Sequence, residues 1–160
     1  MSRSLRFVIV VVGVALAITT STDLKAIQGS AGQGDRDRFV GAWRLAWLEE
    51  PGPDGKVHRA DCTGLFVFTR DGYASVQVMY RSPTGGDAGP VQYAQGGYEA
   101  SYGRYDVDDR VHAWTLHVEG AMVRSLVGKD LKRFYELSGN QLIVTPSSPD
   151  EHWRVAWERQ

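Results

Sequence analysis

The segment GLFVFTRDGYASVQVMY, residues 64–80, contains the pattern that decides the fold. Two runs rich in β-branched and aromatic residues, 64–70 and 73–80, flank the dipeptide Asp71-Gly72. Apolar and polar side chains alternate along the second run, which is the period of a strand with one buried face. An Asp-Gly pair tolerates the positive φ angles of a two-residue turn. The segment is therefore predicted to form an antiparallel β-hairpin.

The same alternation continues on both sides of this hairpin. Six further strands are predicted over residues 39–47, 97–107, 111–119, 131–138, 141–145 and 152–159. Each strand is expected to pair with its neighbour in the sequence. The prediction is an all-β fold, an eight-stranded antiparallel up-and-down β-barrel, because closure removes the exposed edges of an open sheet.

The lengths of the connections divide the barrel into two unlike ends. The connections over 49–63, 81–96 and 120–130 are long and that over 146–151 is intermediate, whereas the other three are tight turns. In a meander, alternate connections fall at the same end, so the long ones gather around one mouth. An eight-stranded barrel either fills with side chains or holds one small ligand, and loops at one mouth favour an opening there.

The N-terminus is predicted to lie outside this fold. Arg3 and Arg6 precede the uncharged run FVIVVVGVALAI, residues 7–18, which has the length of a signal-peptide core and is short for a membrane span. Residues 1–26 are therefore interpreted as a signal peptide with cleavage after Ser21 or Ala26, or as a retained membrane anchor. Residues 27–37 are Gly-rich and predicted to be a flexible linker, and 38–160 the barrel domain. The protein is expected to be exported, periplasmic or secreted.

Composition excludes several classes of function. The chain has a formal net charge of −1, and loss of residues 1–26, with three basic and one acidic side chain, would leave −3. Nucleic-acid binding needs clustered Lys and Arg, so no nucleic-acid partner is expected. Cys62 is the single cysteine, and no Cys or His cluster has zinc spacing. No metal, no cofactor and a monomeric state are expected.

Several segments together resemble a known family. They are VGAWRL (40–45), FTRDGYASVQVM (68–79), YGRYDVD (102–108), LHVEG (116–120), LVGKDLKRFYEL (126–137) and the C-terminal Trp-Glu-Arg (157–159). This ordered set, over about residues 38–159, resembles the bacterial and fungal lipocalin-like domain family. The resemblance implies a calycin-type barrel with a cavity for a small, mostly apolar molecule. Related barrels include both carriers and enzymes, so the fold alone does not settle the chemistry.

The resemblance also implies a structural pair at the closed end. Lipocalins stack an arginine of the last strand on the tryptophan of a Gly-x-Trp motif, and the matching residues here are Trp43 and Arg159. Both are expected at the closed end, where a cation–π contact is geometrically consistent. The family often has a second histidine directly before the position of His117. Leu116 occupies that position here.

Strand 111–119 offers a candidate polar pair whose orientation the sequence leaves open. His117 and Glu119 share one face. If the opposite face, with Trp114, Leu116 and Val118, turns inward, the pair faces solvent, which the burial energy of large apolar side chains favours. If the small residues of the strand line the cavity instead, the pair lies at its mouth. His117 would then be a general acid or base oriented by Glu119.

The remaining candidates belong to the predicted mouth. Arg133 lies on the more apolar face of strand 131–138, and a buried Arg needs an anion, either Glu119 or a ligand carboxylate. Aromatic residues with a polar tip suit a ligand rim. The candidate ligand-binding residues are Trp47, Tyr80, Tyr98, His117, Glu119, Arg133 and Trp153. The leading hypothesis is a non-catalytic binder of a small apolar molecule. The alternative is a cyclase, isomerase or hydratase that uses His117 and Glu119.

Overall fold

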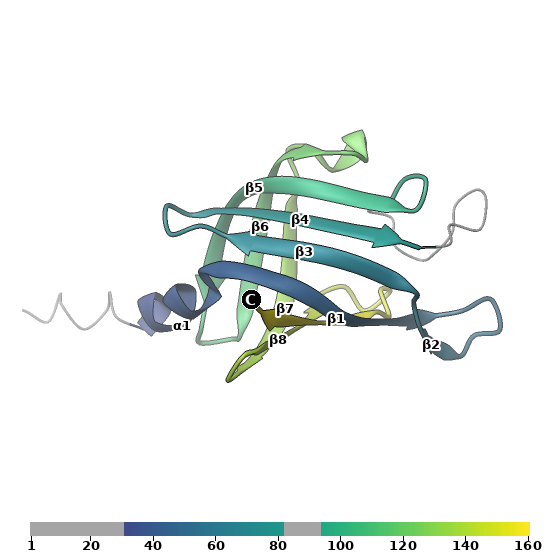
Figure 1. Cartoon of the computed structure of the whole chain (residues 1–160). Coiled ribbons are helices and arrows are strands. Elements are labelled where there is room, and N and C mark those ends of the chain that lie inside the picture. Colours follow the sequence, from purple (N-terminus) through teal and green to yellow (C-terminus); the bar gives the residue numbers. More distant parts are fainter. Residues whose placement is uncertain (1–30, 82–93) are drawn as a thin grey trace, which may run out of the picture.

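The computed structural model describes residues 31–81 and 94–160 (Figure 1). The predicted signal segment therefore lies outside the described residues. In chain order the elements are α1 (Ala31–Phe39), β1 (Gly41–Pro51), β2 (Val57–Arg59), β3 (Cys62–Phe68), β4 (Tyr73–Tyr80), β5 (Tyr98–Asp108), β6 (Ala113–Ala121), the 3₁₀ helix η1 (Arg124–Leu126), β7 (Asp130–Ser138), β8 (Gln141–Pro146) and β9 (Arg154–Arg159).

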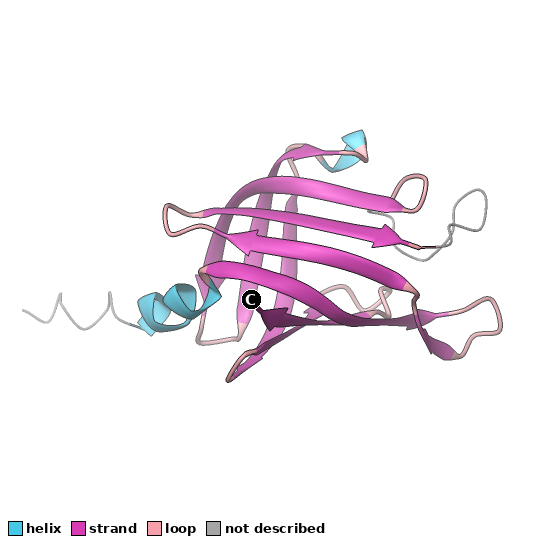
Figure 2. Cartoon of the chain, in the orientation of Figure 1, coloured by secondary structure: helices cyan, strands magenta, loops and turns pink. Residues whose placement is uncertain are grey.

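The strands form a closed antiparallel barrel (Figure 2). From β3 to β9 each strand pairs with the next, and β1 pairs with both β3 and β9, which closes the sheet. The predicted eight-stranded up-and-down barrel is confirmed. The short strand β2, which the sequence pattern does not predict, pairs only with the end of β1, at Glu49–Pro51.

An aromatic core fills one end of the barrel. The inward faces of the strands place Trp43, Phe68 and Tyr105 there, and Phe39 packs edge-on against Phe68 with ring centroids 5.0 Å apart. Each large apolar side chain removed from water contributes about 2 to 3 kcal/mol. These aromatic side chains therefore contribute much of the burial energy at this end of the barrel.

Helix α1 covers the same end. Phe39, at its last position, is fully buried and packs on Tyr135 with ring centroids 4.9 Å apart. The Tyr135 hydroxyl donates a hydrogen bond of 2.8 Å to Asp35. Residues 27–37 were predicted to be a flexible linker, but residues 31–37 belong to this helix. The sequence has no helical apolar period there, and among the side chains described in this helix, residues 34–39, Phe39 is the buried one.

Arg159 connects the last strand to the first strand and to helix α1 at the closed end. Its guanidinium carbon lies 4.2 Å from the centroid of the Trp43 ring. The same guanidinium donates to the carbonyl of Val40 at 2.7 Å and to that of Arg38. Gly41 has a φ of 136°, and a Cβ there would lie 2.8 Å from Nη1 of Arg159. The glycine of the Gly-x-Trp motif therefore makes room for the arginine.

A bulge in β1 changes the face of every residue beyond it. The register with β9 shifts between Leu45 and Trp47, so that Leu48 is buried inside the barrel and Trp47 lies outside. Strict alternation placed Trp47 on the inner face with Trp43 and Leu45. That expectation is wrong because the bulge inserts one residue and reverses the parity.

Candidate functional site

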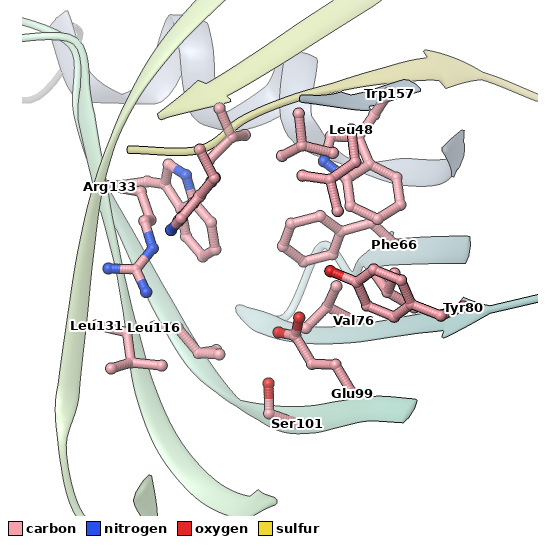
Figure 3. Close-up of a pocket in the computed structure, with 15 residues that line it drawn as sticks. Leu48, Phe66, Val76, Tyr80, Glu99, Ser101, Leu116, Leu131, Arg133 and Trp157 are labelled. Atoms are coloured by element: carbon pink, nitrogen blue, oxygen red, sulfur yellow. The ribbon is translucent and has the colours of Figure 1, made fainter. Parts of the chain in front are cut away.

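A pocket lies inside the barrel (Figure 3), and its lining includes neither Trp43 nor Arg159 of the closed end. Its cavity volume is about 80 Å³, several times what one water molecule needs. Eleven of its lining side chains are apolar or indole, namely Leu48, Phe66, Val76, Val78, Trp114, Leu116, Leu131, Val144, Trp153, Val155 and Trp157. The other four are polar: Tyr80, Glu99, Ser101 and Arg133.

The polar groups reach the cavity because of strand parity. Glu99 and Ser101 belong to the inner face of β5, and Arg133 to the inner face of β7. Figure 3 shows the Glu99 carboxyl, the Ser101 hydroxyl and the Tyr80 hydroxyl facing the space across from the Arg133 guanidinium. A mainly apolar pocket with a few convergent polar groups is the usual form of a small-molecule site.

Glu99 is the most perturbed acid of the pocket. Burial raises the pKa of its carboxyl to about 7, although the Arg133 guanidinium limits the rise. Its side chain keeps some accessible surface because it borders the cavity, but the mainly apolar lining offers few groups that can solvate the charge. The carboxyl therefore changes its charge near neutral pH, which is unusual for Glu.

Arg133 has contacts within the wall of the pocket. Only 7% of the residue is exposed. Its Nη1 donates a hydrogen bond of 2.7 Å to the carbonyl of Lys132, and its Nη2 lies 4.0 Å from Oε2 of Glu151. Its guanidinium carbon also lies 5.2 Å from the Trp153 ring centroid, and the Trp153 Nε1 donates to Glu151 at 2.9 Å. Arg133, Glu151 and Trp153 thus form one connected group.

Tyr80 connects the pocket to the rim. Its hydroxyl donates a hydrogen bond of 2.8 Å to the carboxylate of Glu50, at the end of β1. Burial raises the pKa of the Tyr80 phenol, and the hydrogen bond to Glu50 raises it further. Burial also raises the pKa of Glu50, against the opposing effect of that hydrogen bond. Tyr80 therefore stays protonated and acts as a neutral donor.

The structure separates the predicted ligand-binding residues into two groups. Tyr80, Arg133 and Trp153 line the pocket. The four on the outside of the barrel are Trp47, Tyr98, His117 and Glu119. The ring of Trp47 lies between Arg59 and Arg154, with guanidinium carbons 5.4 and 5.5 Å from its centroid. The Tyr98 hydroxyl donates to Gln77 at 3.2 Å, on the outer face.

His117 and Glu119 face away from the pocket because Trp114, Leu116 and Val118 occupy the inner face of β6. The two ring nitrogens of His117 lie 2.7 Å from Asp130 and 2.9 Å from Asp106. The hydrogen bond to Asp130 raises the pKa of His117 most, and the hydrogen bond to Asp106 raises it further. The pair does not lie at the cavity mouth.

The structure also corrects the expected ion pair between Arg133 and Glu119. Glu119 lies on the outer face, 4.0 Å from the guanidinium of Arg104. Arg133 lies on the inner face and approaches Glu151. The expectation is wrong because the two strands turn these residues to opposite sides of the sheet.

Glu99 is the pocket residue that the sequence analysis missed. It lies at the start of β5, two residues before Ser101 and six before Tyr105 on the same inner face. Parity counted back from buried Tyr105 could have found it. The polar character of Glu99 and Ser101 and the small size of Gly103 hide this inward face.

Two general features of the described ranges, 31–81 and 94–160, bear on the kind of site. Within them no group of three or more His, Cys, Asp or Glu side chains could hold a metal ion. In the same ranges no helix has the length and apolar character needed to cross a membrane.

The fold and the pocket define a β-barrel protein with an internal, mainly apolar cavity. The chain belongs to the lipocalin-like domain family, whose model matches residues 40–160. This match confirms the resemblance found in the sequence. No curated protein matches the chain.

Solved structures similar to this chain include two from Bacteroides. An uncharacterized protein of Bacteroides eggerthii DSM 20697 has 15% identity over 76% of this chain and 99% of that chain, with a TM-score of 0.45. A lipocalin-like protein of Bacteroides uniformis ATCC 8492 has 13% identity over 76% and 98%, with a TM-score of 0.45. A mutant of the fluorescent protein UnaG has 13% identity over 77% and 96%, with a TM-score of 0.39.

Proposed function

We propose that this protein binds one small, largely apolar molecule with a polar group in the cavity of its barrel, without chemical conversion of that molecule. The observation that carries the proposal is the pair of ionisable side chains, Glu99 and Arg133, that face a mainly apolar cavity. A barrel stabilised only by its core would place apolar groups there, because burying a charge is costly. Perturbed ionisable groups in a pocket are typical of functional sites.

The enzymatic alternative lacks support from the residues on which it depended. His117 and Glu119 are held on the outer face, where His117 contacts Asp106 and Asp130. A general acid or base must come within hydrogen-bond reach of the reacting group. A molecule inside the barrel lies on the other side of the sheet from both.

Extraction of the purified protein tests the binding proposal. The full chain is expressed in a bacterial host, purified and extracted with organic solvent, and the extract is analysed by mass spectrometry. The variant Val76→Phe fills the pocket from β4, whereas Gln77→Phe adds the same ring on the outer face of that strand. A compound should accompany the wild type and the Gln77→Phe variant and be depleted from Val76→Phe. A wild-type protein that carries nothing and binds no apolar probe would contradict the proposal.

We also propose that the protein is exported. The support is the sequence pattern of Arg3 and Arg6 followed by the apolar run over residues 7–18. The mass of the protein recovered from the periplasm or medium should correspond to cleavage after Ser21 or Ala26. Recovery of the intact chain from the membrane fraction would indicate a retained anchor, and recovery from the cytosol would contradict export.

A further inference from the structure

The charges around the cavity indicate which polar group the ligand carries. We propose that the ligand is a small apolar amine and that the Glu99 carboxylate binds its protonated nitrogen. This inference rests on the proposed ligand-binding function and specifies the chemical class of the ligand.

Acidic groups outnumber basic ones at this site. Among the described residues that line the cavity or bond directly to its wall, Glu99, Glu50 and Glu151 are carboxyls and Arg133 is the guanidinium. Glu50 accepts the hydrogen bond of Tyr80, and Glu151 lies beside Arg133. Glu50 and Glu151 therefore each have a polar partner within the wall of the pocket.

Glu99 is the carboxyl that remains. Within residues 31–81 and 94–160, no side-chain hydrogen bond or ion pair reaches it, and Arg133 influences it only through space. Its oxygens face the cavity (Figure 3). A buried carboxyl without a partner is costly, and a ligand group that donates a hydrogen bond to it removes that cost.

A basic nitrogen fits this carboxyl better than an anion does. A neutral amine takes the proton of the Glu99 carboxylic acid, which leaves an ammonium and a carboxylate in contact. If the amine enters already protonated, the Glu99 proton leaves to solvent instead. Opposite charges attract strongly in a poorly hydrated pocket, and charge-assisted hydrogen bonds are the stronger kind. A ligand carboxylate would bring a second negative charge close to Glu99.

The rest of the pocket limits the apolar part of this amine. Phe66, Leu116, Val144 and Trp157 belong to the apolar lining of the pocket. Figure 3 shows Phe66 and Trp157 above Glu99. A cavity of about 80 Å³ that is open on one side suits a short alkyl chain whose end extends through the opening. Hexylamine is therefore a suitable probe, with 1-hexanol and hexanoate as matched molecules that differ in the head group.

Titration of the full-length protein with the three probes tests the inference. Trp114, Trp153 and Trp157 line the pocket, so intrinsic tryptophan fluorescence reports occupancy. Hexylamine should bind about tenfold more tightly than 1-hexanol, and hexanoate should bind most weakly. In Glu99→Gln the preference for hexylamine over 1-hexanol should disappear. Glu119→Gln removes a carboxylate from the outer face and should change none of the three affinities.

The outcomes separate this inference from the proposed function. If none of the three probes binds the wild type, the ligand-binding function itself is contradicted. If 1-hexanol or hexanoate binds as tightly as hexylamine, the barrel is a binding protein but the amine assignment is wrong. If Glu99→Gln keeps the preference for the amine, another group recognises the nitrogen. The order of affinities in the wild type decides for or against the amine even if the variant does not fold.

Discussion

The guanidinium of Arg159 lies over the ring of Trp43, 4.2 Å from its centroid, and joins the last strand to the first. It also binds the carbonyls of Val40 and Arg38, which connect α1 to β1. One side chain thus holds the helix, the first strand and the last strand at the closed end. The residue is half-buried at the helix junction, where lost hydrogen bonds are not replaced fully by water.

Arg159→Ala should therefore destabilise the fold. Loss of the cation–π contact and of the two charged hydrogen bonds is expected to lower the free energy of unfolding by about 2 to 4 kcal/mol. Urea unfolding monitored by circular dichroism measures the change. Arg154→Ala is the matched control, because Arg154 lies 3.6 Å from Glu136 at an exposed site and its loss should cost less than about 1 kcal/mol. Equal losses in the two variants would contradict a special role for Arg159.

His117 should contribute more stability in its charged form than in its neutral form. Hydrogen bonds to Asp130 and Asp106 raise its pKa in the folded protein. The stabilisation is therefore complete below the unfolded pKa of about 6.5 and is lost as the pH rises through the higher folded pKa. His117→Gln should lower stability at pH 5.5 by less than about 1 kcal/mol, because the site is partly exposed, and have a smaller effect at pH 9.

Urea midpoints at the two pH values check this prediction, with His152→Gln in the exposed loop before β9 as the control. Binding of apolar probes should be the same in His117→Gln as in the wild type, because the imidazole faces away from the pocket. A variant that folds but no longer binds would restore His117 as a site residue.

The sequence predicts the strands well because their alternation reflects burial directly. Strand β4 has the predicted bounds, 73–80, and the inner face of β6 is the one that carries Trp114 and Leu116. In both strands the large apolar residues share one face, so the energy of burial decides the orientation. The same argument favours an outward His117.

The predictions fail where one local event or one unusual residue overrides this pattern. The bulge in β1 reverses the orientation of Trp47, and no residue type marks its position. Glu99 is turned inward by the parity of β5, although burial alone would place a carboxyl outside. Helix α1 is held by Phe39 and by contacts with Tyr135, which lies far along the chain. The sequence around residues 31–39 does not indicate these contacts with Tyr135.

Cys62 should be a slow-reacting thiol. Burial, together with the nearby carboxylates of Glu50 and Asp61, raises its pKa to about 11. Since the thiolate is the nucleophile, alkylation by iodoacetamide at pH 8 should be at least tenfold slower than in a denatured control. Mass spectrometry of timed samples measures the rate. Modification as fast in the native protein as in urea would show that the thiol is not desolvated.

Glu99 should make the stability of the protein depend on pH in a direction that is unusual for an acid. Its folded pKa of about 7 lies above the ordinary value of 4.5, so the folded state binds the proton more tightly than the unfolded state does. The stabilisation by this group is complete below pH 4.5 and is lost as the pH rises toward 7.

Glu99→Gln should therefore match the wild type near pH 4.5 and exceed its stability at pH 8 by about 2 to 3 kcal/mol. The groups that face this carboxyl from other strands are Arg133 on β7 and Tyr80 on β4, and Arg133 opposes the effect only in part. Urea unfolding at both pH values measures it, with Glu119→Gln on the outer face as the control. Parallel pH profiles for Glu99→Gln and the wild type would show that Glu99 is ionised without cost, and hence that the pocket is well hydrated.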